Sequence, residues 1–259
     1  MNLLYRLLLV YLTATPTLAQ LNESDTTLVQ LRASLTGNVQ QGNVDVTTVR
    51  GKLDFTLSPV RDWVFKSQNS SLYQSFYSTK ADNDLFSRNY VYFRPWQRVY
   101  PFGIGYVSTN FRRSIDVRYF IGAGSSVQLI NSRQHVLKAS AGAVYEETRF
   151  SASTFNEATY NGSSTIALWR ATTWLGGWHY LLDNHLRLYY DAFWQPAFSD
   201  GANYRWQFDV GFDFPIWRGL AFNALYTYTH ENVVVTQIKA DDKILTLGLS
   251  YNLRKLHQQ

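Results

Sequence analysis

The stretch NYRWQFDVGFDFPIW, residues 203–217, alternates between large apolar and polar or small side chains. Every even position from Tyr204 to Ile216 is aromatic or aliphatic, whereas the positions between them include Arg205, Asp209 and Asp213. Alternation with period two puts each class on one face of a β-strand. The strand therefore needs an apolar medium on one side and a polar one on the other.

The same alternation recurs along the chain and predicts twelve strands. The third strand is polar on both faces over KSQNSSLYQS, so we expect part of it to project beyond an apolar layer. No stretch after the N-terminus has the ~18 consecutive apolar residues of a membrane helix. The expected strands are 29–39, 44–58, 63–80, 84–95, 99–112, 116–131, 135–150, 162–181, 184–197, 201–215, 219–233 and 242–254.

The connections between these strands fall into two classes. Those after the even-numbered strands are tight, as in LLDN and PIWRG, whereas two of the others are long: SASTFNEATYNGS and ENVVVTQIKADD. Short turns at one end and longer loops at the other are typical of outer-membrane barrels with an even strand number. We therefore predict an all-β fold, a transmembrane antiparallel up-and-down β-barrel of about twelve strands. The alternative is a soluble β-sandwich or lipocalin, but a lipocalin has eight strands.

Composition agrees with a barrel that separates two media. Aromatic residues make up 16% of the chain and charged residues 17%, yet the mean hydropathy is only −0.23. Tyr and Trp gather near the expected strand ends, where interfacial girdles form. The girdle candidates are Trp63, Tyr100, Trp178, Tyr180, Trp194, Trp217, Tyr228 and Tyr251.

The N-terminus has the pattern of an export signal. Arg6 precedes an apolar run, and Thr17-Leu18-Ala19 resembles a small-x-small cleavage site. We expect a signal peptide at 1–19, an N-terminal periplasmic segment at 20–28, a barrel at 29–254 and a tail at 255–259. The chain has no cysteine, which excludes disulfides and thiolate sites.

Four segments resemble a known group. They are GNVDVTTVRGKLDF (42–55), IDVRYFIGAGSSVQL (115–129), SAGAVYEETRF (140–150) and ADDKILTLGLSYNL (240–253). In this order the chain resembles a domain-of-unknown-function family of salt-induced outer-membrane proteins. The resemblance implies an outer-membrane barrel and supplies no catalytic residue.

One feature departs from the family pattern. Barrel proteins often end on an aromatic residue that the assembly machinery reads, whereas here RKLHQQ follows Tyr251-Asn252-Leu253. Either the assembly signal lies inside the last strand, or that strand ends elsewhere than expected.

The residues give little support for chemistry. Barrel lipases pair a histidine with a serine on adjacent strands, but the five histidines are scattered at strand ends and in the tail. We expect no enzyme activity, no cofactor and no metal site. The acidic groups DND (82–84) and ADD (240–242) lack calcium-loop spacing and are interpreted as solvated turns.

The polar faces of the strands predict a charged barrel interior. Arg or Lys facing lipid at the bilayer midplane would cost ~2–4 kcal/mol each. Two hypotheses follow: ion pairs such as Arg187/Asp209, Asp191/Arg205 and Lys138/Asp54 close the lumen, or the excess of positive charge lines a narrow path that favours anions. The lumen-lining candidates are Arg32, Arg50, Lys52, Asp54, Arg118, Lys138, Glu146, Arg170, Arg187, Asp191, Arg205, Asp209 and Asp213.

The predicted location is the bacterial outer membrane. The expected partners are outer-membrane lipid and lipopolysaccharide, with the barrel-assembly machinery during biogenesis, and the expected state is a monomer. The net charge is +5, but the sequence has no basic cluster longer than two residues, which argues against a nucleic-acid partner. The leading functional hypothesis is a structural or envelope-stress barrel with a closed or narrow lumen. A small anion-preferring channel and a lipid-modifying barrel enzyme are the alternatives.

Overall fold

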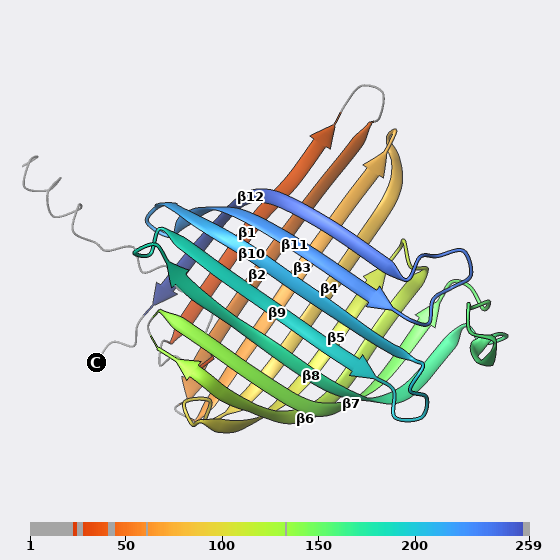
Figure 1. Ribbon diagram of the computed structural model, residues 1–259, viewed down its shortest axis with the longest axis horizontal. Coiled ribbons are helices and arrows are strands. Elements are labelled where there is room, and N and C mark those ends of the chain that lie inside the picture. Colours follow the sequence, from red (N-terminus) through yellow and green to blue (C-terminus); the bar gives the residue numbers. More distant parts are fainter. Residues whose placement is uncertain (1–22, 25–27, 41–44, 61, 133, 256–259) are drawn as a thin grey trace, which may run out of the picture.

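A computed structural model of the chain forms one closed antiparallel barrel (Figure 1). The structure describes residues 23–24, 28–40, 45–60, 62–132 and 134–255, so the expected signal peptide lies outside the described residues. Neighbouring strands pair in sequence order, and β1 closes the barrel against β12. The strands are β1 Val29–Gln40, β2 Val46–Val60, β3 Trp63–Phe76, β4 Thr79–Phe93, β5 Val99–Asn110, β6 Ile115–Asn131, β7 His135–Phe150, β8 Thr165–Leu181, β9 Leu186–Pro196, β10 Tyr204–Trp217, β11 Leu220–Glu231 and β12 Asp241–Lys255.

The predicted fold is confirmed, and all twelve expected strands are present. The largest shift in a strand boundary is at the start of β4, which begins at Thr79 instead of residue 84. The reason is a tight turn at Tyr77 and Ser78, both with positive φ, which continues the β3–β4 hairpin through residues that read as a loop. A closed barrel leaves no strand edge, so every strand satisfies its backbone through two neighbours.

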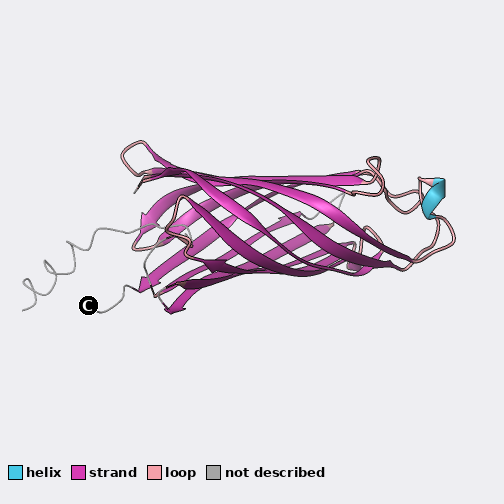
Figure 2. Cartoon of the chain, turned by 90° about the horizontal axis from the view of Figure 1, so that it is seen from below, coloured by secondary structure: helices cyan, strands magenta, loops and turns pink. Residues whose placement is uncertain are grey.

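The two ends of the barrel differ in their connections. The first residue of β1, Val29, pairs with the last residue of β12, Lys255, and short turns join the other strands at this end. We call it the inner end. The outer end has the long β7–β8 and β11–β12 loops, with a short 3₁₀ helix, η1 (Ala158–Tyr160), in the first of them (Figure 2). No helix in the described part of the chain is long and apolar enough to cross a membrane.

The long outer loops pack on each other and on the barrel rim. Phe155 forms a β-bridge with Val235, and both side chains are buried. They join an apolar cluster with Ile115, Phe150 and Ile166 at the outer ends of β6, β7 and β8. The sequence left open where these loops lie; the structure gives them an apolar core of their own at the rim.

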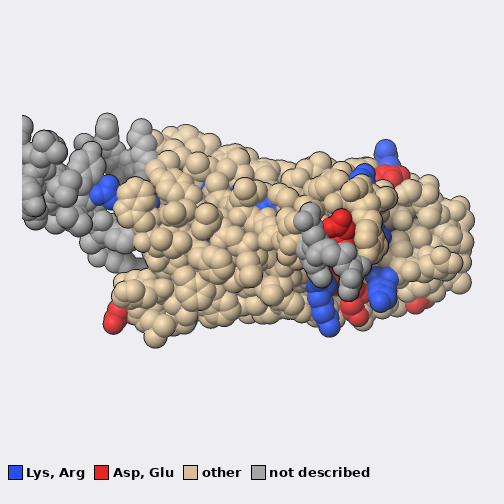
Figure 3. Space-filling view, turned by 90° about the horizontal axis from the view of Figure 1, so that it is seen from above, with Lys and Arg blue, Asp and Glu red and all other residues tan. Residues whose placement is uncertain are grey.

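The exterior is predominantly apolar. In Figure 3 the charged side chains on the visible face gather toward the outer end and leave a broad band almost free of charge. Leu245, Leu247 and Leu249 on β12 are each about half exposed or more on this outer surface. An exposed apolar band around a closed barrel is the surface that contacts lipid in membrane barrels.

The girdle prediction is right for some strand-end aromatics and wrong for others. Trp63, Trp194, Trp217 and Tyr251 are between 47% and 65% exposed on the exterior. In contrast, Tyr100, Trp178 and Tyr180 are buried inside the barrel, at 0%, 6% and 9% exposure. On β5 the large aromatics share the inward face, because smaller residues occupy the outward one. On β8, Trp174, Trp178 and Tyr180 face inward, whereas Trp169 faces outward and is 55% exposed.

One part of the exterior is polar. Asn69 on β3 and Asn89 on β4 face outward, and each donates a hydrogen bond to a serine two residues earlier on its own strand. Asn69 also donates to the carbonyl of Leu53, at 3.1 Å. These internal bonds satisfy the amide donors, which lowers the cost of a polar group on an apolar surface. The polar segment of the third predicted strand is therefore a continuous part of the sheet.

Candidate functional site

The candidate functional region is the barrel interior. Among the thirteen lumen candidates, eight are at least nine-tenths buried in the structure, and Lys52, Asp54, Lys138, Asp191 and Asp209 are partly buried. The eight buried residues are Arg32, Arg50, Arg118, Glu146, Arg170, Arg187, Arg205 and Asp213. They come from seven strands, β1, β2 and β6–β10, and all except Arg50 belong to one of two acidic centres.

The first acidic centre is Glu146 on β7. Arg170 on β8 donates to it at 3.1 Å, Arg205 on β10 forms a second ion pair, and Arg118 on β6 lies 3.9 Å away. Arg118 also makes a two-pronged contact with Glu231 on β11, at 2.7 and 2.9 Å. Two acids and three arginines thus connect β6, β7, β8, β10 and β11 across the outer half of the lumen.

The second acidic centre is Asp213 on β10. It accepts hydrogen bonds from Arg32 on β1 at 3.1 Å and from Arg187 on β9. Asn223 and Ser250 on the other side complete its shell at 2.7 and 3.2 Å. Asp213 therefore ties both sides of the β1–β12 closure to β9 and β10.

The predicted ion pairs are wrong. Arg187 pairs with Asp213 instead of Asp209, because the β9–β10 register sets these two residues directly opposite each other. Asp191 lies 3.6 Å from Arg88 on β4, across the lumen, while Arg205 binds Glu146. Lys138 binds Glu23 instead of Asp54. In each case the partner is fixed by barrel register or closure, which alternation does not reveal.

The third acidic centre lies before the first strand. Glu23 is within the interior near the inner end, 2.9 Å from Lys138 and 3.2 Å from Lys66. Tyr100 also donates its hydroxyl to this carboxylate at 2.9 Å. Burial by itself would raise the pKa of Glu23, but the two ammonium groups more than offset it and hold the pKa well below its usual range. The segment expected to be periplasmic thus contributes a side chain to the lumen.

An aromatic cluster fills the middle of the lumen. Trp174 on β8 packs edge-on against Tyr90 on β4 and Phe102 on β5, with ring centroids 6.5 and 6.2 Å apart. Tyr92 and Tyr100 extend the cluster toward the inner end. These rings come from β4, β5 and β8 and meet in the lumen on that side of the barrel; we call this cluster the septum.

Two cavities border the septum. The outer cavity has a volume of about 150 Å³ and includes Phe120, Trp174 and Phe193 in its wall. The inner cavity, of about 90 Å³, lies between Glu23, Tyr90 and Trp178. Trp174 borders both, which places it at the boundary.

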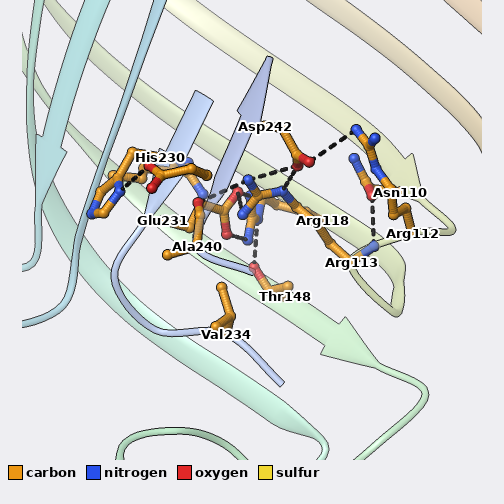
Figure 4. Close-up of polar contacts among 12 residues, drawn as sticks. Asn110, Arg112, Arg113, Arg118, Thr148, His230, Glu231, Val234, Ala240 and Asp242 are labelled. Atoms are coloured by element: carbon orange, nitrogen blue, oxygen red, sulfur yellow. Dashed lines mark hydrogen bonds and ion pairs between the residues drawn. The ribbon is translucent and has the colours of Figure 1, made fainter. Parts of the chain in front are cut away.

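A polar rim surrounds the outer cavity (Figure 4). Arg112 and Arg113, in the β5–β6 connection, share the carboxylate of Asp242 on β12 at 3.2 and 2.8 Å. Asp82 is fully buried and lies 3.4 Å from Arg112. The interpretation of 82–84 and 240–242 as solvated turns is therefore wrong for Asp82 and Asp242, which belong to β4 and β12 and pair with arginines. Asp84 on β4 accepts a hydrogen bond from Asn110, and Asp241, 52% exposed, pairs with His230.

Sequence reasoning missed several interior charges for identifiable reasons. Arg88 lies on β4, where alternation is weak. Glu231 and Asp242 lie at strand ends beside a long loop, where the sequence does not show which way a side chain faces. Glu23 precedes every predicted strand. The parity of β4 offered one usable signal, because Arg88 shares its face with Tyr90 and Tyr92.

The four histidines that the structure describes do not form a serine–histidine pair. His135 and His179 contact each other through ring nitrogens 3.2 Å apart, and His179 also contacts the Tyr190 hydroxyl at 2.9 Å. His230 pairs with Asp241 at 2.8 Å. Among the residues that the structure describes, no histidine ring nitrogen is hydrogen-bonded to a serine, and no three potential metal ligands cluster together. His257 lies outside that part of the chain.

Comparison with known proteins agrees with the resemblance found in the sequence. The family model described as "Protein of unknown function, DUF481" matches residues 33–253. No curated protein matches.

Solved structures with a similar fold are bacterial barrels. The NanC porin structure superposes with a TM-score of 0.51 at 8% identity, covering 87% of this chain and all of that one. The translocator domain of the autotransporter NalP from Neisseria meningitidis has a TM-score of 0.47 at 10% identity, with 88% and 89% coverage. At such low identity the likeness to NanC shows the barrel fold alone.

Proposed function

The chain belongs to the DUF481 family of proteins of unknown function, and from its interior we propose that it is an outer-membrane barrel closed to general diffusion. Its role would be structural or related to envelope stress, with at most a narrow solute path. The location is supported by the closed twelve-strand barrel and its apolar outer band. Closed barrels and helices are the structures that satisfy every backbone group in lipid.

The observation that carries the proposal is the aromatic septum. Trp174, Tyr90 and Phe102 pack on one another inside the lumen and are each no more than 8% exposed. An open diffusion pore needs a continuous water-filled path, whereas here two cavities lie on either side of packed rings. Twelve strands enclose a lumen between the filled eight-stranded barrels and the open sixteen-stranded porins, so side chains decide whether it is open.

The ion pairs support the same role. A buried charge without a partner costs several kcal/mol, so the arginines would be unfavourable in a dry lumen without Glu146, Glu231 and Asp213. These acids bind arginines from five different strands. The networks therefore cross-link the wall, which supports a stable closed barrel, and the proposal assigns no catalytic role to the histidines.

A second candidate function is passage of small anions through the outer cavity. It is favoured by the cavity's excess of cationic over acidic side chains, since charged rings select ions by sign. Passage would require the septum rings to move.

Liposome swelling tests the proposal. Vesicles with the refolded wild-type protein should swell in isotonic monosaccharide no faster than protein-free vesicles. Trp174→Ala, which removes the ring shared by both cavities, should give faster swelling. Rapid swelling with wild-type protein would refute a lumen closed to general diffusion. Extraction of the natural protein by carbonate without detergent would refute membrane residence.

A further inference from the structure

The outer cavity is lined by seven cationic and four acidic side chains; the acids are Asp84, Asp209, Glu231 and Asp242. Glu231 is held by Arg118, and Asp242 by Arg112 and Arg113. Acids outside the lining also pair with three of its cations: Glu146 with Arg205, Asp82 with Arg112, and Asp191 with Arg88. The two remaining cations lie on the β2 wall, and the lining acids Asp84 and Asp209 are more than 4.0 Å from both.

Arg50 and Lys52 supply that charge. They are two residues apart on β2, so both face inward, and both border the outer cavity. The polar contact of Arg50 is a long hydrogen bond of 3.5 Å to the Thr227 hydroxyl. Within the described residues, neither Arg50 nor Lys52 has a carboxylate within 4.0 Å.

Buried donors without hydrogen bonds line the same region. Five lining residues each have a buried N–H without a hydrogen bond, against one buried lining acceptor, an oxygen of Asp84. Two of these donors still have an acid nearby: Arg112 Nε lies 3.4 Å from Asp82, and Arg113 Nη1 lies 4.0 Å from Glu231. Unmade hydrogen bonds at buried polar groups are costly, so a ligand that supplies acceptors would be stabilised there. The five donors are Arg50 Nε, Arg112 Nε, Arg113 Nη1, Arg205 Nη1 and Trp174 Nε1.

The cavity also offers aromatic surface. Tyr106 and Phe120 stack with ring centroids 4.5 Å apart, and Trp174 packs near Phe193. All four rings line the cavity beside the cations. A volume of about 150 Å³ matches that of a protein cavity known to hold one benzene ring.

We propose that the outer cavity binds a small organic anion, with one carboxylate or phosphate attached to a group no larger than a single ring. Arg50, Lys52 and Arg205 would hold the anionic group, and the aromatic wall would hold the rest. The rim residue Arg112 lines the cavity with a side chain that is 36% exposed, so part of the cavity wall lies at the outer surface. A ligand can therefore enter from outside with the septum closed, so the site goes beyond the proposed barrier role.

Titration calorimetry with benzoate tests the site, using the full folded chain in zwitterionic detergent micelles and empty micelles as the blank. Benzamide is the matched neutral probe, because it keeps the ring and removes the charge. We expect saturable benzoate binding at least tenfold tighter than that of benzamide, since hydrogen bonds to charged groups are the stronger class. Equal binding of the two probes would overturn the proposal.

Two variants locate the binding. Arg50→Gln and Lys52→Gln should each weaken benzoate binding about tenfold, and neither breaks an ion pair within 4.0 Å. Lys66→Gln is the matched control, because Lys66 is an interior cation of the inner cavity, and it should leave binding unchanged. If all three variants bind like the wild type, benzoate binds elsewhere and the assignment is wrong.

The binding test is independent of the barrier test. A barrel that excludes solutes but does not bind benzoate would overturn this inference alone. A barrel that binds benzoate and also allows rapid swelling would overturn the closed-lumen proposal alone.

Discussion

The outer and inner halves of the lumen are built from the same strands and differ in how their charges are matched. In the inner half, Glu23 is held by two lysines and a tyrosine hydroxyl, and Asp213 by Arg32 and Arg187. At the outer end, Arg50 and Lys52 have no carboxylate within 4.0 Å in the described residues. The inner half is suited to closing the barrel, and the outer half to receiving an anion.

The difference shows that a charged lumen has more than one use within one barrel. A cation with a close acid acts as a cross-link between strands, as Arg170 does with Glu146. A cation without such an acid retains attraction for a ligand, because its charge is not compensated nearby. Counting lumen charges therefore says less about function than establishing which of them are paired.

The largest expected effect is at Glu146. Glu146→Gln leaves Arg170 and Arg205 without their shared carboxylate inside the barrel, so we expect a loss of about 3–5 kcal/mol in the free energy of unfolding. The free energy of unfolding is measured by urea titration in lipid vesicles, with the folded fraction detected by its gel mobility. Its neighbour Glu147 faces outward and pairs with exposed Arg149, so Glu147→Gln should leave the midpoint unchanged. Equal effects would mean that the interior network does not stabilise the barrel.

The second prediction concerns the septum. Trp174→Ala removes the ring that borders both cavities, and we expect a destabilisation of about 3 kcal/mol together with new ion conductance. Trp169→Ala is the control, since that indole is 55% exposed on the exterior. It should leave conductance as in the wild type. A folded Trp174→Ala barrel without conductance would show that other side chains close the lumen.

The third prediction concerns Glu23 at the inner end. Glu23→Gln removes the carboxylate that holds Lys66 and Lys138, and should lower the free energy of unfolding by about 1–3 kcal/mol at pH 7. Because the pKa of Glu23 is lowered on folding, its contribution is complete above the unfolded carboxyl pKa of about 4.3. It is lost as pH falls through the lower folded pKa.

The gap in stability between wild type and Glu23→Gln should therefore narrow as pH falls below about 4, and remain constant between pH 5 and 7. The urea midpoints of both proteins, measured from below pH 4 up to pH 7, test this prediction. A gap that widens on acidification would contradict the assigned ion pairs.

The smallest effect is expected outside the lumen. Asp62 and Arg94 form an ion pair at 3.2 Å in the inner-end turns, with side chains 35% and 46% exposed. Asp62→Asn should change the free energy of unfolding by less than about 0.5 kcal/mol, because exposed ion pairs contribute little. A loss as large as that of Glu146→Gln would remove the distinction between interior and surface charges.

The sequence predicts the barrel well because alternation is a local property. On β10, large apolar and charged residues occupy opposite faces, so both the strand and its inward side are evident. On β5, Tyr100 and Phe102 alternate with small apolar residues, and both faces suit an apolar medium. Hydropathy then does not indicate which face of the strand turns into the barrel, and side-chain volume decides it.

The site is less predictable because its partners are distant in sequence. Arg32 and Asp213 are 181 positions apart and meet through barrel closure. Glu23 joins the lumen from a segment without strand pattern, so no periodicity could reveal it. The inward face of each strand can be found from the sequence, but the choice of partner depends on register and stagger.

Planar-bilayer conductance of the refolded protein tests the central claim most directly. Trp174→Ala is the positive control, because it should insert and conduct under the same conditions. The wild-type protein is predicted to insert without stable conductance steps. Large, long-lived conductance steps from the wild-type protein would contradict a lumen closed by the aromatic septum.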